Sequence, residues 1–340
     1  MLNCVYRLVA PRTFVPVQMQ FETAGKVVVR PTHLSICNAD QRYYQGTRSE
    51  EVLRKKLPMA LIHEGIGVVV SSDSPEYQRG DRVVMLPNNP VEEDPIIAEN
   101  YLRSSQFCGS GYDGFMQEMV VLDPKRLVRL PGNIDLDVAA FTELVSVSVH
   151  AISRFDKIAH ERRNRIGVWG DGNVGFIVSL LLHVLYPETQ IIVFGVNQTK
   201  LADFTFAHET HLVGNIDDVV NVDHAFECAG GEGSQYAIAQ MIDKINPEGT
   251  MSLLGVSENP PPVNTRMVLE KGLRIFGTSR SGRVDFQRTV QIYEEHPEVP
   301  DYLRALVGVV KEVSTLKDAS AAFEADIRKP MGKTIMHWNM

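Results

Sequence analysis

The chain has 340 residues, of which 44% are hydrophobic and 22% are charged. These proportions are typical of a folded globular protein, and the length allows about two domains. The formal net charge of −8 argues against nucleic-acid binding as a main function, because an acidic protein repels the phosphate backbone. A small anionic substrate stays open, because a few local cations can outweigh the net field.

The cysteines Cys4, Cys37, Cys108 and Cys228 are widely separated and form no C-x-x-C pair. This spacing argues against a disulfide framework and fits a reducing compartment. The first residues lack a basic stretch followed by an apolar one, and the longest apolar run, 174–186, is too short to cross a bilayer. We therefore expect a soluble cytoplasmic protein that binds no membrane.

The sequence has two parts that predict different kinds of secondary structure. Up to about residue 130 the sequence is β-rich and irregular, with short apolar runs separated by Pro, Gly, Asn and Asp. After about residue 143 strands alternate with helices, which is typical of βαβ units and a parallel sheet. The expected strands are 26–30, 66–70, 82–86, 165–169, 190–194, 223–228, 249–254 and 273–276, and the expected helices are 173–186, 233–244 and 284–296.

The polar segment that ends in Lys333–Trp338 is expected to return to the first domain. The sequence therefore predicts an α/β protein with two domains. Residues 1–146 and 283–340 form a β-rich domain, and residues 147–282 form a doubly wound parallel sheet with helices.

Residues 170–175 fit the pattern G-x-G-x-x-G, directly after a predicted strand and at the start of a predicted helix. Gly170 allows the tight turn, Gly172 lets the backbone approach a pyrophosphate, and Gly175 lets helix and strand pack closely. The helix N-terminus favours the anion. This context favours a dinucleotide site over a purely structural turn. The residues assigned to the site are Gly170, Gly172, Asn173, Val174 and Gly175.

The end of the second strand of this domain indicates which dinucleotide binds. That strand ends at Gly195, and no acidic residue occurs between Glu188 and Asp203. NAD sites usually carry an acid here for the ribose 2′-hydroxyl, whereas Gly195 leaves room for a 2′-phosphate. The candidate donors to that phosphate are Asn197, Thr199 and Lys200. The sequence predicts NADP rather than NAD, and the alternative is a solvated loop that recognises little.

Ahead of this motif stand Cys37, the pair His63 and Glu64, and Glu143. Each alone is ordinary, because a single Cys or His is more often a packed or surface residue. Together they offer thiolate, imidazole and carboxylate, which are the usual Zn²⁺ ligands, and a catalytic zinc site keeps one position open.

In this order, before a Rossmann fingerprint, these residues resemble the zinc-dependent medium-chain dehydrogenases over essentially the whole chain. The resemblance implies a GroES-like catalytic domain, a Rossmann domain and one catalytic zinc. It implies that Cys37, His63 and Glu143 are ligands and that Glu64 is a fourth, exchangeable one. Asp40 corresponds to the carboxylate that orients His63.

The sequence departs from this family at three points. Many relatives carry a four-cysteine structural zinc loop, but residues 85–115 contain only Cys108, so we expect no structural zinc. Ala39 replaces the first hydroxyl of the usual proton relay, and Arg42 replaces a histidine further along it. The proton route stays open between metal-bound water, Glu64 and Tyr43.

Longer strings resemble the ribulose-5-phosphate reductases, also called ribitol-5-phosphate dehydrogenases; they include 37–44, 57–65, 111–117 and 169–173. This resemblance implies reduction of D-ribulose 5-phosphate by NADPH, with zinc acting as a Lewis acid on the C2 ketone. It also implies a supply of ribitol phosphate for CDP-ribitol in teichoic acid or capsule synthesis, a cytidylyltransferase partner and a homodimer.

The substrate phosphate needs cations, and Arg42 beside the metal loop is the first candidate, followed by Tyr43, Arg48 and Arg280. Lys333 resembles the basic residue that relatives place on the cofactor pyrophosphate.

Other functions stay open at this stage. An NAD-linked polyol dehydrogenase would oxidise an unphosphorylated sugar alcohol, and the strand end without an acid argues against it. A zinc-free binding or structural relative, or a quinone reductase, would lack the Cys, His and Glu set.

Overall fold

The computed structural model describes residues 1–216, 218–329 and 331–340, and the chain divides into two compact units. Unit 1 comprises Met1–Ser146 and Ser281–Met340, and unit 2 comprises Val147–Arg280. The expected boundary at 282/283 lies two residues from the observed junction. The C-terminal segment belongs to unit 1, as the sequence predicts.

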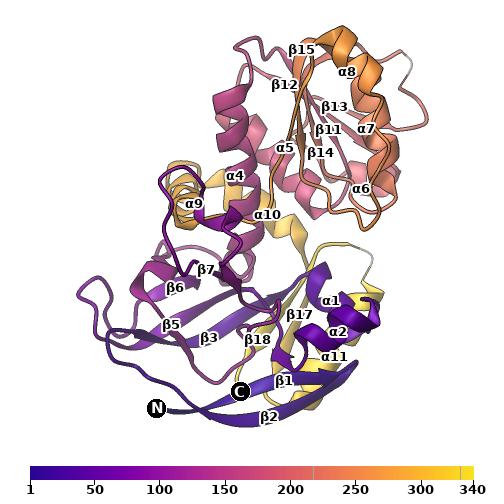
Figure 1. The fold of residues 1–340 in the computed structure, drawn as a ribbon. Coiled ribbons are helices and arrows are strands. Elements are labelled where there is room, and N and C mark those ends of the chain that lie inside the picture. The colour runs from indigo at the N-terminus through magenta and orange to yellow at the C-terminus, as the bar shows by residue number, and fades with distance from the viewer. Residues whose placement is uncertain (217, 330) are drawn as a thin grey trace. The chain divides into compact units, whose positions relative to one another are not determined.

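Unit 1 is built mainly from β-sheets (Figure 1). Its largest sheet has the order β10-β6-β5-β3-β18-β17, with β9 paired to β3, and a second sheet has the order β2-β1-β4. All pairings are antiparallel except β17 with β18. The strands are β1 Leu2–Ala10, β2 Thr13–Gln20, β3 Val27–Ile36, β4 Met59–Ala60, β5 Glu64–Ser72, β6 Arg82–Met85, β7 Asn88–Asn89, β8 Gln106–Phe107, β9 Val120–Leu122, β10 Leu127–Arg129, β17 Val307–Val313 and β18 Lys333–Trp338.

Six α-helices lie wholly within the described residues of this unit. They are α1 Asn38–Tyr44, α2 Glu50–Lys56, α3 Leu136–Ala139, α9 Arg283–Glu295, α10 Glu298–Leu303 and α11 Leu316–Arg328. Helix α4, Thr142–Ile158, begins in unit 1 and continues in unit 2. Helix α11 and strand β17 were not expected from the sequence. The apolar face of α11 anchors it, because Phe323 stacks on Tyr44 with ring centroids 4.6 Å apart and contacts Phe14 at 5.6 Å.

Unit 2 is a doubly wound parallel sheet with the order β13-β12-β11-β14-β15-β16. Helix α5 lies on one face of the sheet, and α7 and α8 lie on the other (Figure 1). The strands are β11 Arg165–Trp169, β12 Gln190–Gly195, β13 Glu209–Leu212, β14 Val222–Glu227, β15 Ile245–Leu253 and β16 Arg274–Gly277. The helices are α5 Asn173–Leu185, α6 Gln198–Leu201, α7 Gly233–Lys244 and α8 Thr265–Lys271.

The central strands of unit 2 could be predicted from the sequence because both faces of the sheet are buried, which favours runs of apolar residues. Every residue of β14 is buried, and β12 is buried from its second residue onward, which is typical of parallel strands covered by helices. Trp169 of β11 and Phe194 of β12 are paired on adjacent strands, and their rings stack with centroids 4.0 Å apart. Strand β13 was missed because three of its four residues are polar and none of them is buried at the sheet edge.

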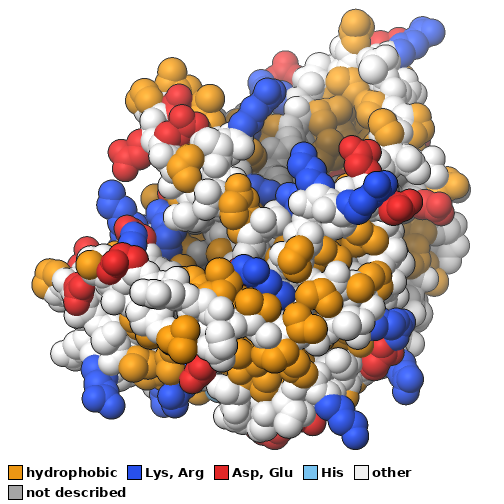
Figure 2. Space-filling model, turned by 60° about the horizontal axis from the view of Figure 1, so that its bottom comes forward, with side chains coloured by type: hydrophobic (Ala, Val, Ile, Leu, Met, Phe, Trp, Pro, Cys, Tyr) orange, Lys and Arg blue, Asp and Glu red, His pale blue; other side chains and the backbone are white. Residues whose placement is uncertain are grey.

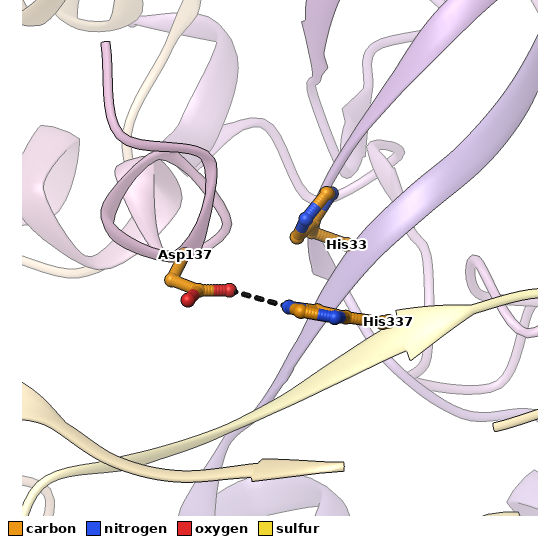
Figure 3. A group of neighbouring side chains, drawn as sticks. All are labelled: His33, Asp137 and His337. Carbon is orange, nitrogen blue, oxygen red and sulfur yellow. Dashed lines mark hydrogen bonds and ion pairs between the residues drawn. The ribbon is translucent and has the colours of Figure 1, made fainter. Parts of the chain in front are cut away.

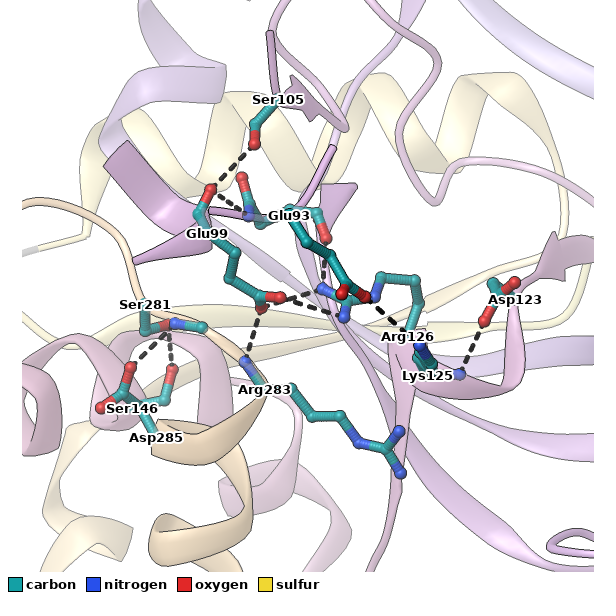
Figure 4. Close-up of polar contacts among 12 residues, drawn as sticks. Glu93, Glu99, Ser105, Asp123, Lys125, Arg126, Ser146, Ser281, Arg283 and Asp285 are labelled. Atoms are coloured by element: carbon teal, nitrogen blue, oxygen red, sulfur yellow. Dashed lines mark hydrogen bonds and ion pairs between the residues drawn. The ribbon is translucent and has the colours of Figure 1, made fainter. Parts of the chain in front are cut away.

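An ion pair between the buried Arg126 and the half-buried Glu99 holds the segment at which the chain re-enters unit 1 (Figure 4). The Glu99 carboxylate accepts hydrogen bonds from both terminal nitrogens of Arg126, at 2.9 and 3.1 Å. Its Oε1 also accepts from the backbone N–H of Arg283 at 2.7 Å, in the first turn of α9. The hydroxyls of Ser281 and Ser146 lie 2.7 Å apart. Glu99 therefore fixes the start of α9.

No helix in the described part of the chain combines the length and the apolar character needed to cross a bilayer. On the face drawn in Figure 2, basic and acidic side chains are interspersed. This mixed surface agrees with the small net charge per residue that the sequence shows.

Replacing Glu99 by Gln is expected to lower the free energy of unfolding by about 1–3 kcal/mol, because the buried guanidinium of Arg126 loses its charged partner. Glu93→Gln is the matched control, since Glu93 pairs with Lys125 at 3.5 Å while 92% exposed, and such pairs contribute little. Thermal unfolding of both variants measures the difference, and an equal loss in the two would contradict the role of Glu99.

Candidate active site

Strand pairing brings the expected metal ligands together in unit 1. Strand β3 ends at Ile36, so Cys37 follows it directly, and β5 begins at Glu64, so His63 precedes it directly. The two strands are antiparallel neighbours with Ser35 opposite Glu64. The end of one strand and the start of the other therefore deliver thiol, imidazole and carboxylate to the same place.

The strand on the other side of β3 adds a cation. Strand β18 pairs with β3 so that Thr334 lies opposite Ile36. Lys333, the first residue of β18, therefore lies beside Cys37, and its ammonium lies 2.8 Å from each carboxylate oxygen of Glu64. The side chain is only 4% exposed. The resemblance assigns Lys333 to the cofactor pyrophosphate. In the structure its ammonium instead pairs with Glu64, and this pairing compensates for the burial of both charges.

The ligand atoms of Cys37, His63 and Glu64 all lie within 4.8 Å of one another. Glu64 is fully buried, His63 is 7% exposed and Cys37 is half-buried. Glu64 Oε2 is buried with no hydrogen-bond partner, because the nearby ammonium is out of hydrogen-bond geometry. Zn²⁺ binds such donors at ~2.0–2.3 Å, so small side-chain movements would close this set around an ion. The residues present fit zinc.

One carboxylate fixes both ligand-bearing loops. Asp40 is fully buried; its Oδ2 accepts from the backbone N–H of Cys37 at 3.1 Å, and its Oδ1 accepts from that of Ile62 at 3.0 Å. The bond to Cys37 is half of a capping box at the start of α1. Asp40 Oδ1 also lies 3.6 Å from His63 Nδ1. Asp40 thus holds the two loops as well as facing the imidazole.

The residue before His63 has an unfavourable backbone conformation. Ile62 has a φ of 71°, and a β-branched side chain rarely occupies this left-handed region. Its N–H is held by Asp40, and its carbonyl accepts from the N–H of Phe115 at 2.7 Å. Strain of this kind is kept where the surroundings impose it, and it is common at functional sites. Here it directs His63 toward Cys37.

Glu143 lies in the first turn of α4 and is 5% exposed. It is not part of the group within 4.8 Å. Burial raises the pKa of Glu143 to about 7, against the attraction of His63, and the charge of Glu64 adds to the rise. Glu143 is thus electrostatically coupled to the cluster, and its role as a ligand stays a prediction.

The cluster is rich in negative groups. Burial opposes a charge on His63, yet the neighbouring Asp40 and Cys37 raise the pKa of His63 well above its usual value. Groups that attract a proton in this way also attract a divalent cation. Cys108, which also lies near His63, is different, because burial raises the pKa of its thiol to about 12.

The substrate candidates Arg42, Tyr43 and Arg48 lie on α1 or just after it. Tyr43 is 4% exposed and belongs to the apolar core of unit 1, a packing role that the sequence did not indicate. The Arg48 guanidinium lies over its ring at 5.1 Å. Burial, and then the charge of Arg48, lower the pKa of Arg42. Arg280 lies at the end of unit 2 with a φ of 60°.

In unit 2 the glycines of the predicted dinucleotide motif have the backbone geometry expected of them. Gly170 has a φ of 138°, and a Cβ on Gly175 would lie 1.9 Å from the carbonyl oxygen of Gly170. A Cβ on Gly172 would meet nothing within 4 Å. Gly172 caps α5, so open space lies where the backbone N–H groups of Asn173 and Val174 begin the helix. This cradle fits a pyrophosphate.

The end of β12 differs from the sequence expectation. Asp171, inside the glycine motif, reaches across and accepts from the backbone N–H groups of Val196 and Asn197 at 2.8 and 2.7 Å. A Cβ on Gly195 would lie 2.7 Å from the Cβ of Asp171. The room at Gly195 is therefore filled by Asp171 and not left for a 2′-phosphate. No acidic residue directly follows β12 in the sequence, but the carboxylate of Asp171 reaches the end of this strand from the glycine motif after β11.

Some of the groups expected to donate hydrogen bonds to a 2′-phosphate after β12 already form hydrogen bonds within the protein. Asn197 caps α6, its Oδ1 accepting from the N–H groups of Thr199 and Lys200 at 2.9 and 3.2 Å. Asn197 and Thr199 are exposed, and Lys200 is half-buried.

Comparison with known proteins finds two family matches. Residues 23–132 match the alcohol dehydrogenase GroES-like domain, and residues 190–295 match the zinc-binding dehydrogenase domain. The chain is 53% identical to a ribulose-5-phosphate reductase of Bacillus spizizenii and 52% identical to ribulose-5-phosphate reductase 1 of Staphylococcus aureus, each covering 100% of both chains. The crystal structure of S. aureus TarJ in complex with NADPH superposes with a TM-score of 0.89, at 47% identity over 100% of both chains.

Replacing Asp40 by Asn is expected to weaken zinc binding about 10–100-fold, because one of the two backbone N–H groups then faces an amide donor and the loops lose their common anchor. Competition against a chromophoric chelator measures the affinity. Asp81→Asn is the control, since Asp81 accepts from the N–H of Gln78 at 2.9 Å in an exposed turn. Wild-type affinity in the Asp40 variant would contradict the role assigned to this carboxylate.

Proposed function

The chain belongs to the zinc-binding medium-chain dehydrogenases, and from this premise we propose that it reduces D-ribulose 5-phosphate to D-ribitol 5-phosphate with NADPH. The observation that carries the proposal is the cluster of Cys37, His63 and Glu64, in which Asp40 holds the backbone at Cys37 and just before His63. The full-length likeness to relatives named ribulose-5-phosphate reductase supports the choice of substrate.

Cys37 and His63 would hold the zinc, with Glu64 and Glu143 as carboxylate ligands. Zinc bound there supplies Lewis-acid polarisation of the substrate carbonyl. Lys333 balances the charge of Glu64, so this carboxylate need not stay on the metal throughout. Burial holds the pKa of Glu143 at about 7, so its carboxyl can keep a proton at neutral pH until a cation favours the ionised form.

Arg42 and Arg48 are the candidates for the substrate phosphate. The pKa of Arg42 is lowered first by burial and then by the charge of Arg48, so the two cations lie close enough to repel each other. Arg48 Nε is also buried without a hydrogen-bond partner. A phosphate group would satisfy this donor and relieve the repulsion, because its oxygens accept bidentate, charge-assisted hydrogen bonds.

For the cofactor, the open space at Gly172 and the start of α5 suit the pyrophosphate. Lys200 and Thr199 are the groups that would meet the 2′-phosphate. Asp171 is compatible with this because two backbone N–H groups already stabilise its charge. The same carboxylate also supports a second candidate, an NAD-linked dehydrogenase, since NAD sites place an acid at this strand end.

The supply of ribitol phosphate for CDP-ribitol, a cytidylyltransferase partner, a homodimer and a cytoplasmic location complete the proposal. The first three rest on the family resemblance, and the location rests on the widely separated cysteines, which fit a reducing compartment.

The proposed function predicts rapid NADPH oxidation with D-ribulose 5-phosphate. NADH and unphosphorylated ribulose are each expected to give at least about tenfold lower kcat/KM, because each removes one charged recognition group. Metal removal is expected to abolish turnover, and added zinc to restore it. Full activity after complete metal removal, or a preference for free ribulose, would overturn the assignment.

Arg48→Gln is expected to raise the KM for D-ribulose 5-phosphate about 10–100-fold, because a charge-assisted contact to phosphate contributes about 1.5–3 kcal/mol. The kcat/KM for unphosphorylated ribulose should stay unchanged, since that substrate has no phosphate. Arg54→Gln on α2 is the matched control, because the Arg54 side chain is 76% exposed. Equal effects on both substrates would place Arg48 outside the phosphate site.

Lys200→Ala is expected to raise the KM for NADPH about 10-fold or more and to leave that for NADH unchanged, because only NADPH carries the 2′-phosphate. The exposed Lys157 on α4 provides the control variant Lys157→Ala. Steady-state kinetics with both cofactors measures the ratio, and a parallel loss for NADH would favour the NAD-linked candidate.

A further inference from the structure

A second group of potential metal ligands lies on the large sheet of unit 1. His33 of β3 and His337 of β18 lie opposite each other in the antiparallel pairing, with ring centroids 4.6 Å apart. Asp137 of α3 points at the same space (Figure 3). The ligand atoms of His33, Asp137 and His337 all lie within 4.8 Å of one another. His33 precedes Cys37 by four residues, about 13 Å of strand, so this group is separate from the Cys37 cluster.

The hydrogen bonds of His337 orient it for metal binding. Glu312 of β17 lies opposite His337 in the parallel pairing, and its Oε1 lies 2.7 Å from His337 Nδ1. The other ring nitrogen, Nε2, lies 2.7 Å from Asp137 Oδ1. Histidines that bind metals commonly donate one N–H to a carboxylate, which fixes the ring and directs the second nitrogen at the ion. Glu312 occupies this orienting position.

His33 offers a nitrogen that carries no proton. Its Nδ1 lies 3.1 Å from the hydroxyl of Thr32, which donates at 3.5 Å to the carbonyl of Ile66. A hydroxyl that donates to this carbonyl can accept from His33 Nδ1–H, and in that tautomer the other ring nitrogen carries a lone pair. Burial, and then the charge of His337, lower the pKa of His33 to about 4. A neutral imidazole needs no deprotonation before it binds a metal.

We propose that His33, Asp137 and His337 form a second divalent metal site, suited to Zn²⁺, in which Glu312 orients His337. Two imidazoles and one carboxylate are a frequent zinc ligand set. Binding breaks the contact between His337 Nε2–H and Asp137: Nε2 forms the bond to the metal, and one proton passes to solvent. This site is unrelated to the four-cysteine loop that the sequence lacks.

Charged neighbours surround this site. Carboxylate oxygens of Glu312 and Asp137 lie 2.7 Å from the two ring nitrogens of His337, so a bound ion takes the place of the contact to Asp137. Arg82 is a cation that acts on His33. Glu312 is held by Asn339 at 2.9 Å, and Asp135, which caps α3, pairs with Arg304. A bound ion would link β3, β18 and α3 and so stabilise the folded protein.

Equilibrium dialysis of the holoenzyme against Zn²⁺ tests the proposal. The wild type is expected to bind two zinc ions per chain, and His337→Gln and His33→Gln one, with NADPH-dependent activity retained. Glu312→Gln should keep the second ion with about 10–100-fold lower affinity. His296→Gln is the matched control, because His296 pairs only with Glu298 at the surface among the contacts described.

Two further measurements keep the test decisive if a variant folds poorly. In the wild type the second ion should raise the thermal unfolding temperature. With Co²⁺ in both sites, only the Cys37 site should give a sulfur charge-transfer band. A wild type that binds a single ion even at millimolar Zn²⁺, or a second ion that persists in both histidine variants, would overturn the proposal.

Discussion

The metal cluster depends on one buried carboxylate that holds two loops. Asp40 is fully buried and accepts from the backbone N–H groups of Cys37 and Ile62. A buried carboxylate without such donors would cost several kcal/mol, so these hydrogen bonds fix where it can lie. Because one donor belongs to the residue that carries the thiol and the other to the residue before His63, the two ligands are held at a set separation. The unfavourable φ of Ile62 persists for the same reason.

Strand register does the rest of the positioning in unit 1. Strand β3 lies between β5 and β18, and this order brings Glu64 and Lys333 to Cys37 from opposite sides. Four residues earlier, the same pairing of β3 with β18 brings His33 to His337. Two chemically different clusters thus arise from one set of backbone hydrogen bonds. The Cys37 cluster is the more deeply buried of the two and contains a thiol, which suits tight zinc binding. The His33 cluster is half-exposed and contains no thiol, which suits weaker binding.

Local patterns predicted much of this protein. The G-x-G-x-x-G motif and the buried strands of unit 2 can be recognised in the sequence because both depend on neighbouring residues. The structure confirms these strands and the strand-turn-helix geometry of the motif. The expected set of Cys37, His63 and Glu64 also comes together. The sequence could not show that Lys333 neutralises Glu64 or that Asp171 fills the space at Gly195, because each contact joins residues from different strands or loops. The group of His33, Asp137 and His337 was missed for the same reason. Strand β17 was missed because Gly308, Lys311 and Glu312 interrupt its valines and most of its residues are not buried.

Zinc-edge anomalous diffraction from crystals of the holoenzyme tests the central claim most directly. Our account predicts a strong peak bounded by the sulfur of Cys37, the imidazole of His63 and a carboxylate of Glu64 or Glu143, with ligand distances of ~2.0–2.3 Å. Asp40 should keep its two backbone hydrogen bonds in that crystal. A fully loaded, active crystal with no anomalous peak among these side chains would contradict the account.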